Sequence, residues 1–322
     1  AMDRRGEITD LYGGREDLKA GILRCVGEPE RRFQEDALRI LRTLRFSAVL
    51  GFAIEEKTAA ALRETAALLT YIAPERIRTE MDKLLCGGHV LPVLLDYPEV
   101  LGVFLPEVLP CVGFDQHNRH HIYDVWGHTA HAVAAAPAER VLRWAMLLHD
   151  VGKPACFTRD AAGVGHFYGH PAVSAELAET MCRRLRMDNR TAERVVTLVR
   201  WHDRDIPRTE RAIARAVSQL GEETFRQLLD VKRADNAAQS PEDRGRLADI
   251  QQAEDILNAL EARKQCFSLN HLAVDGRDMM ALGLRGREIG DGLHALLEAV
   301  LDGAENDRET LLTLALAREN HK

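Results

Sequence analysis

The stretch that decides the fold lies at residues 141–154, Val141-Leu142-Arg143-Trp144-Ala145-Met146-Leu147-Leu148-His149-Asp150-Val151-Gly152-Lys153-Pro154. Its first eight residues are largely apolar and predict a buried helix, whereas Gly152 and Pro154 are typical of helix ends. The helix is therefore expected to end near the doublet His149-Asp150. Because the chain turns there, both side chains can reach one metal ion.

The same helical periodicity extends over most of the chain. Apolar residues recur at spacings of three and four, and strict alternation is rare. This pattern predicts an all-α fold. One short N-terminal strand is allowed at residues 7–12, before two glycines. Candidate helices cover residues 33–50, 55–66, 74–86, 89–97, 122–150, 171–186, 190–202, 208–219 and 221–236, with a long helix from about 242 to 264.

The composition limits which classes of protein are possible. The 322 residues are 46% hydrophobic and 29% charged, which suffices for a large core and predicts two or three domains. The net charge of -7 means that a nucleic-acid partner must be held by local basic patches. The six cysteines form no CxxC pair, and no long apolar run occurs. We therefore expect a reduced, cytoplasmic setting and no membrane partner.

Further histidines and an aspartate that could bind metal occur on both sides of the doublet in the sequence. A ligand set without thiolates suits a divalent metal used in hydrolysis, such as Zn, Mn, Fe, Ni or Mg, better than a structural zinc. Taken alone, however, the doublet is also compatible with a simple hydrogen bond at a helix end. The candidate metal ligands are His128, His149, Asp150, His170, His202 and Asp235.

The order of these residues resembles the HD superfamily of metal-dependent phosphohydrolases, in which a His, a His-Asp doublet and a distant Asp bind metal. His128, the doublet and Asp235 match that pattern in order. The resemblance implies that His170 and His202 add a second ion, so that one or two ions bind and Asp150 can bridge them. It further implies catalytic roles for Asp150 and for Lys153, as a phosphate contact. Such ions acidify a coordinated water and neutralise phosphoryl charge.

A second pattern lies in the predicted helix at residues 33–50. On one continuous helix, Glu35, Arg39 and Arg42 fall within about 60° of one another, with Asp36 beside them. A carboxylate and a guanidinium one turn apart can offer an acceptor and donor edge to a nucleobase. The alternative is an ordinary solvated face with ion pairs between neighbouring turns.

The succession of features resembles bacterial CCA-adding tRNA nucleotidyltransferases and their poly(A) polymerase relatives over almost the whole chain. Residues 10–18 resemble the flexible loop of that family, and residues 74–80 resemble its neck motif. Glu35-Asp36-Ala37-Leu38-Arg39 resembles the EDxxR motif, whose Asp and Arg recognise CTP and ATP. The resemblance implies tRNA 3′ ends as partners and these nucleotide-selecting residues: Glu35, Asp36, Arg39 and Arg42.

The resemblance also implies a division into domains. Residues 1–30 would be the remnant of a head-domain end with its flexible loop, 31–97 the neck, 98–121 a connector, 122–238 the HD domain and 239–322 a helical, tRNA-binding tail. In the tail, Arg285 and Arg287 precede a helix and suit phosphate contact. A plain turn between helices is an equally good interpretation of that loop.

Nucleotide transfer in that family depends on a GS motif, two metal-binding carboxylates and an RRD motif in an α/β head. No DxD or GS-type element occurs in a predicted strand of this sequence. We therefore expect no nucleotide transfer from this chain alone, and a head domain or subunit, where one exists, as its partner. Three functions stay open. We favour the neck, HD and tail portion of a CCA-adding enzyme whose HD site hydrolyses 2′,3′-cyclic or 3′-terminal phosphates. The others are a freestanding HD phosphohydrolase acting on nucleotides and a non-enzymatic tRNA-binding subunit.

Overall fold

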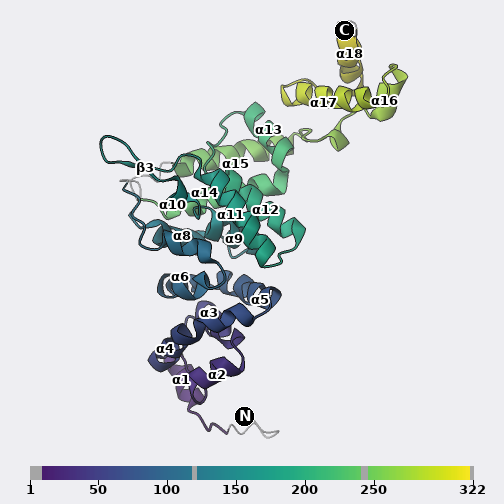
Figure 1. Ribbon diagram of the computed structural model, residues 1–322. Helices are drawn as coiled ribbons and strands as arrows, with labels where there is room; N and C mark the ends of the chain where they lie inside the picture. Colours follow the sequence, from purple (N-terminus) through teal and green to yellow (C-terminus); the bar gives the residue numbers. More distant parts are fainter. Residues whose placement is uncertain (1–8, 118–121, 241–245, 320–322) are drawn as a thin grey trace. The chain divides into compact units, whose positions relative to one another are not determined.

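The computed structural model describes residues 9–117, 122–240 and 246–319 (Figure 1). Helices form nearly all of its regular structure, which confirms the predicted all-α fold. The chain divides into two compact units, Ala1–Arg204 with Asp230–Arg244, and Asp205–Leu229 with Gly245–Lys322. No helix among the described residues is both long and apolar enough to cross a membrane.

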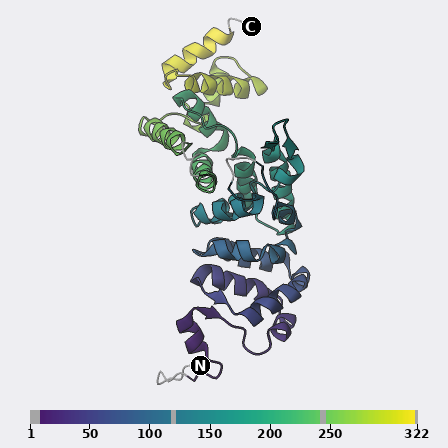
Figure 2. The same cartoon turned by 90° about the vertical axis from the view of Figure 1, so that its left-hand side faces the viewer.

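The first unit begins with stacked helices, seen in successive layers in Figure 2. Here α2 packs on α4, α3 on α5 and α6, and α6 on α8. Ile40, Leu41 and Leu44 of α3 are completely buried in this stack. The helices of this part are α1 (Gly14–Ala20), α2 (Pro29–Glu35), α3 (Leu38–Leu50), α4 (Glu56–Thr65), η1 (Ala66–Tyr71), α5 (Pro74–Leu85), α6 (Val90–Asp96), α7 (Pro98–Gly102) and η2 (Pro106–Cys111). The described part of 98–121, expected as a connector, therefore contains two short helices.

The helix expected over residues 33–50 is in fact two helices, so that prediction was wrong. Asp36 adopts an extended conformation between α2 and α3, with φ -153°. Its Oδ1 atom accepts the backbone N–H of Leu38, the first residue of α3, at 3.2 Å. The break follows because a short carboxylate side chain offers the backbone a hydrogen bond that competes with the helix.

The N-terminal strand was also misplaced. Residues 7 and 8 lie outside the described residues. Residues 9–12 form no strand, with a bend at 11 and 12, and the Asp10 carboxylate accepts the N–H groups of Gly14 and Arg15. The strands are two-residue pairs elsewhere. β1 (Ile22–Leu23) pairs in parallel with β2 (Ala53–Ile54), and β3 (Thr158–Arg159) pairs antiparallel with β4 (Gly165–His166).

The remaining helices of the first unit carry the ligand candidates. The helix expected over 122–150 is broken after Ala135, where Pro137 prevents continuation. Its second half ends at Leu148 with His149 as the C-cap, as the sequence predicts. These helices are α8 (Val125–Ala135), α9 (Arg140–Leu148), α10 (Lys153–Cys156), α11 (His170–Arg184), α12 (Asn189–Trp201) and α14 (Glu222–Ala237), of which the residues from Asp230 belong to this unit.

The second unit has its own apolar core, which includes Ile213, Val217, Phe225 and Leu257. Arg215 of α13 pairs with Asp302 at the end of α17, at 2.8 Å. The helices that lie wholly in this unit are α13 (Glu210–Leu220), α15 (Arg246–Ala262), η4 (Leu269–His271), α16 (Gly276–Ala281), α17 (Arg287–Leu301) and α18 (Arg308–Glu319).

Candidate metal centre

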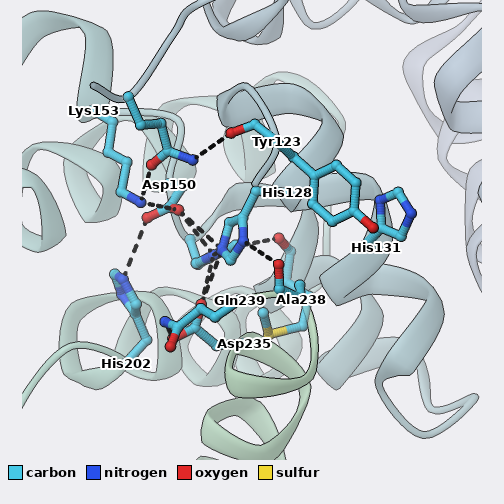
Figure 3. Close-up of polar contacts among 12 residues, drawn as sticks. Tyr123, His128, His131, Asp150, Lys153, His202, Asp235, Ala238 and Gln239 are labelled. Carbon is cyan, nitrogen blue, oxygen red and sulfur yellow. Dashed lines mark hydrogen bonds and ion pairs between the residues drawn. The ribbon is translucent and has the colours of Figure 1, made fainter. Parts of the chain in front are cut away.

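The structure brings all six predicted metal ligands together. Figure 3 labels four of them, His128, Asp150, His202 and Asp235. They come from helix ends and helix faces far apart in the sequence: α8, the end of α9, the start of α11, the end of α12 and α14. Asp235 is 18% exposed at its side chain, and the other five are buried. The ligand candidates form two groups, His128, His149 and Asp235 in one, and Asp150, His170 and His202 in the other.

In the first group, nitrogen atoms face one carboxylate oxygen. His128 Nε2 lies 3.0 Å from Asp235 Oδ1 and 3.3 Å from His149 Nε2. His149 Nε2 lies 3.7 Å from the same oxygen. The other Asp235 oxygen accepts the side-chain N–H of Gln239 at 3.2 Å, which holds the carboxylate in place.

The second group is built in the same way. His170 Nε2 lies 3.1 Å from His202 Nε2 and 3.2 Å from Asp150 Oδ1. Asp150 Oδ2 points to the first group instead, 3.2 Å from His149 Nε2 and 3.4 Å from His128 Nε2. Each oxygen of this one carboxylate thus serves a different group, as a bridging ligand would.

The outward nitrogen of each histidine is held by a backbone carbonyl. The Nδ1 atoms of His149, His170 and His202 lie 2.6, 2.9 and 2.6 Å from carbonyl oxygens three residues earlier. His128 Nδ1 lies 3.3 Å from the carbonyl of Ala238. A carbonyl only accepts, so each Nδ1 carries the hydrogen, and a neutral ring then turns its Nε2 lone pair toward the centre.

These features fit divalent cations. Asp150 is fully buried, yet neither oxygen makes a hydrogen bond of regular geometry. The Lys153 ammonium lies 2.7 Å from Oδ2 as an ion pair, but a buried carboxylate without regular hydrogen bonds stays costly unless its charge is balanced further, as a bound cation would do. Together with four Nε2 lone pairs, it supplies the oxygen and nitrogen donors that a divalent transition metal prefers.

Charge inside the centre shifts the ionisation of its members. Burial alone lowers the pKa of His149, but the charges of Asp150 and Asp235 and their hydrogen bonds raise it to about 10. Burial raises the pKa of Asp150, yet His149 and Lys153 hold it well below its ordinary value. Burial lowers the pKa of His202, and the charges of His149 and His170 lower it further, whereas Asp150 acts in the opposite direction. A proton on His149 and a metal ion therefore compete for the same Nε2 atom.

Lys153, predicted to contact a phosphate, is buried beside the centre. Its Nζ atom lies 2.7 Å from Asp150 Oδ2 and donates to Gln116 Oε1 at 2.9 Å. Gln116 lies in the connector predicted at residues 98–121, and no sequence pattern assigned it a role. The only sequence signal near it was a polar, histidine-rich stretch, which does not indicate that its side chain is buried.

The nucleotide-selecting candidates are brought together only in part. Arg39 donates to Glu35 at 3.0 Å across the α2–α3 break. Asp36 lies 3.7 Å from Arg76 of α5, a partner that the neck motif contains but sequence analysis did not assign. Arg42 is exposed and makes no ion pair within the described residues.

The tail candidates lie at the start of α17. The backbone N–H of Arg285 donates to Glu288, and the Arg287 side chain, 93% exposed, lies 3.6 Å from Asp291. Both arginines belong to the second unit, whereas all six ligand candidates belong to the first.

Fold and site together define a helical protein with an HD domain. A family model described as "HD domain" matches residues 119–240, and one described as "Probable RNA and SrmB- binding site of polymerase A" matches residues 51–110. An A-adding tRNA nucleotidyltransferase of Deinococcus radiodurans is 36% identical over 318 residues, covering 93% of this chain and 71% of its own length. A CC-adding tRNA nucleotidyltransferase of Thermus thermophilus is 33% identical, covering 94% and 71%.

The chain belongs to the tRNA nucleotidyltransferase family, as the sequence motifs predicted. A solved structure of the Bacillus stearothermophilus CCA-adding enzyme in complex with CTP superposes with a TM-score of 0.69 at 25% identity, covering 99% of this chain and 71% of that one. A Thermotoga maritima CCA-adding enzyme complexed with tRNA shares the fold, with a TM-score of 0.54 at 18% identity, covering 96% and 67%. The HD domain and the family imply divalent-metal use, and the two groups above are the candidate ligands.

Proposed function

We propose that this chain forms the neck, HD domain and tail of a CCA-adding type of tRNA nucleotidyltransferase. We further propose that its HD centre is a metal-dependent phosphohydrolase of the 2′,3′-cyclic phosphodiesterase or phosphatase type. The observation that carries this proposal is the buried Asp150 carboxylate, which turns one oxygen to each group of ligands. The domain boundaries proposed are 31–97 for the neck, 98–121 for the connector, 122–238 for the HD domain and 239–322 for the tail, after residues 1–30 from the end of a head.

The ligand groups support two ions. His128, His149 and Asp235 would hold one and His170 and His202 the other, with Asp150 shared between them. Four imidazoles favour Zn, Mn, Fe or Ni over Mg, which prefers oxygen ligands. When bound, such ions supply an acidified water and neutralise phosphoryl charge. The chain itself orients the imidazoles through their Nδ1 hydrogen bonds, and Lys153 would contact a phosphoryl oxygen.

The neck and tail would bind tRNA and nucleotides. The Arg39–Glu35 pair and Asp36 beside Arg76 present donors and acceptors at one helix junction, which suits selection of CTP and ATP. Relatives of this fold were solved with CTP, ATP and tRNA. Arg285 and Arg287 would contact phosphates of the tRNA. No described strand carries a pair of carboxylates of the kind that transfer requires. We therefore propose that this chain alone would not transfer nucleotides and would act with a head domain or subunit in the cytoplasm.

The proposal is tested by metal removal and reconstitution. The full chain is stripped with a chelator, reloaded with Mn, Ni, Zn, Fe or Mg in turn and assayed with 2′,3′-cyclic AMP and with a 3′-terminal phosphate. We expect at least one metal to restore hydrolysis and Asp150→Ala to abolish it. Glu179→Ala, on the exposed side of α11, is the control and should stay active. Absence of hydrolysis with every metal would contradict the proposed activity.

Binding of tRNA separates the two alternatives. A freestanding phosphohydrolase would hydrolyse cyclic nucleotides and show no tRNA binding. A non-enzymatic tRNA-binding subunit would bind tRNA with a strong salt dependence and hydrolyse nothing. Fluorescence-detected binding of tRNA across a salt series, run on the same preparations as the hydrolysis assay, distinguishes all three functions.

A further inference from the structure

We infer that Gln116 is a positioning residue of the HD centre: its amide holds the Lys153 ammonium against Asp150 and directs a remaining N–H toward the substrate phosphoryl group. This inference rests on the proposed phosphohydrolase function. Lys153 would touch the substrate, whereas Gln116 would act through Lys153 alone.

The orientation of the Gln116 amide is determined by its neighbours. The side chain is 1% exposed. Its Oε1 atom accepts from Lys153 Nζ at 2.9 Å, and its Nε2 atom donates to the backbone carbonyl of Tyr123 at 3.2 Å. Reversing the amide would place N–H groups against an ammonium and an oxygen against a carbonyl, so only one orientation satisfies both contacts.

Lys153 needs such a second acceptor. An ammonium on a flexible four-carbon stem has three donors and no preferred direction of its own. Its Nζ atom forms an ion pair with Asp150 Oδ2 at 2.7 Å and donates a hydrogen bond to Gln116, while the Phe167 ring centroid lies 5.3 Å away. The ion pair and the hydrogen bond together hold the ammonium in place and leave an N–H of Lys153 without an acceptor among the described residues. That donor is the one available to a phosphoryl oxygen.

The backbone beneath Gln116 is held tightly against β4. The N–H of Gly165 donates to the carbonyl of His117 at 2.9 Å. A Cβ atom on Gly165 would lie 2.2 Å from the Gln116 carbonyl oxygen, so only glycine permits this approach. Nearby, Phe114 packs edge-on against Phe157 with centroids 5.3 Å apart. The amide is therefore placed by packing rather than by a free loop.

A double-mutant cycle on the full, metal-loaded chain tests the inference with 2′,3′-cyclic AMP as substrate. Gln116→Met keeps the volume and removes the acceptor. We expect it to lower kcat by about 10- to 100-fold, the usual effect of losing a hydrogen bond to a charged group, with a smaller change in KM. In a Lys153→Met background the same substitution should change kcat less than twofold, because its effect passes through Lys153.

Three further variants serve as controls. His117→Asn alters the next residue, whose side chain lies outside this network and whose φ of 47° asparagine tolerates, and should stay within twofold of the parent. If Gln116→Met fails to fold or to bind metal, Gln116→Glu and Gln116→Asn are compared instead. The Glu variant keeps an acceptor for Lys153, so its kcat should fall less than tenfold. The Asn side chain is too short to reach both partners, so its kcat should fall further.

Three results would each overturn the role of Gln116. They are a wild-type kcat in Gln116→Met, additive losses of kcat in the double variant, and equal losses of kcat in the Glu and Asn variants. An inactive parent chain with every metal would instead refute the proposed hydrolase, and the inference with it. Metal content and melting temperature, measured on every variant, separate these outcomes from simple unfolding.

Discussion

The indole N–H of Trp144 donates to Asp82 Oδ1 over 2.7 Å, joining α9 of the HD domain to α5 of the neck. The same carboxylate lies 3.1 Å from Arg140 and 3.3 Å from Arg78. Two hydrogen bonds, from Trp144 and Arg78, and an ion pair with Arg140 thus converge on one partly buried carboxylate. This arrangement ties the neck to the wall of the metal centre, since α9 ends at the His149-Asp150 doublet.

Replacing Trp144 by Phe should lower the free energy of unfolding by about 2–4 kcal/mol, because it removes a hydrogen bond to a charged group and leaves a void in a buried position. Urea unfolding provides the measurement. Trp126→Phe is the matched control, since Trp126 is also buried but donates to the neutral carbonyl of Leu94 at 2.9 Å. It should cost less, and an equal or larger cost would contradict the role given to Asp82.

Metal stoichiometry should follow the two ligand groups. His202→Ala is expected to leave about one ion per chain, because the His128, His149 and Asp235 group stays complete. Asp150→Ala should leave less than one, because both groups lose an oxygen. Elemental analysis after exhaustive dialysis measures the ratio. Two ions retained in the Asp150 variant would show that this carboxylate is no bridge.

The stability of the metal-free protein should fall as the pH rises from about 6.5 to 10. The pKa of His149 is raised from its ordinary value of 6.5 to about 10, so folding favours the protonated ring. Its contribution is complete below pH 6.5 and is lost toward pH 10, with a slope of at most about 1.4 kcal/mol per pH unit. Metal binding needs the deprotonated ring, so apparent metal affinity should rise over the same range.

Urea unfolding in chelator at pH 6, 7, 8 and 9 measures this slope, with His149→Gln as the control that should flatten it. A parent protein whose stability is constant or increases over this range would refute the assignment. The metal-loaded protein should lack the decline.

Asp36 can be tested for two roles at once. Asp36→Ala should cost about 0.5–1.5 kcal/mol, because the Leu38 N–H loses its acceptor at the start of α3. Asp36→Asn keeps that acceptor and removes the charge, so its stability should match the parent. If the carboxylate also selects nucleotides, Asp36→Asn should alter CTP and ATP binding without a loss of stability, as isothermal titration can show. Equal stability losses in both variants would exclude the local hydrogen bond as the cause.

The tail should contribute to tRNA binding through phosphate contacts. Replacing Arg285 and Arg287 by Ala should weaken binding and lower the slope of log K against log salt by up to about 2, since each phosphate contact adds nearly one. Arg263→Ala, which breaks an exposed ion pair with Glu210, is the control and should keep the slope. An unchanged slope in the double variant would remove both arginines from the interface.

Local pattern predicted much of the helical structure but failed where side chains act on the backbone. Helices α4, α5, α6, α11 and α12 lie within one or two residues of their predicted limits, because their apolar spacing is regular. The predicted helix over 33–50 was wrong at Asp36, where a carboxylate competes for a backbone N–H. The predicted helix over 122–150 was wrong near Pro137, where a proline ring prevents the helix from continuing despite the apolar residues on both sides.

By itself the sequence determined that the protein is helical, to which family it belongs and which imidazoles and carboxylates are available, because these depend on residue type, order and spacing. Only the tertiary structure decided that the two oxygens of Asp150 face different ligand groups, and that Gln116, 37 residues before Lys153, lies against its ammonium. Such contacts arise when helices distant in the chain pack together, and no local periodicity encodes the direction in which a buried side chain then points.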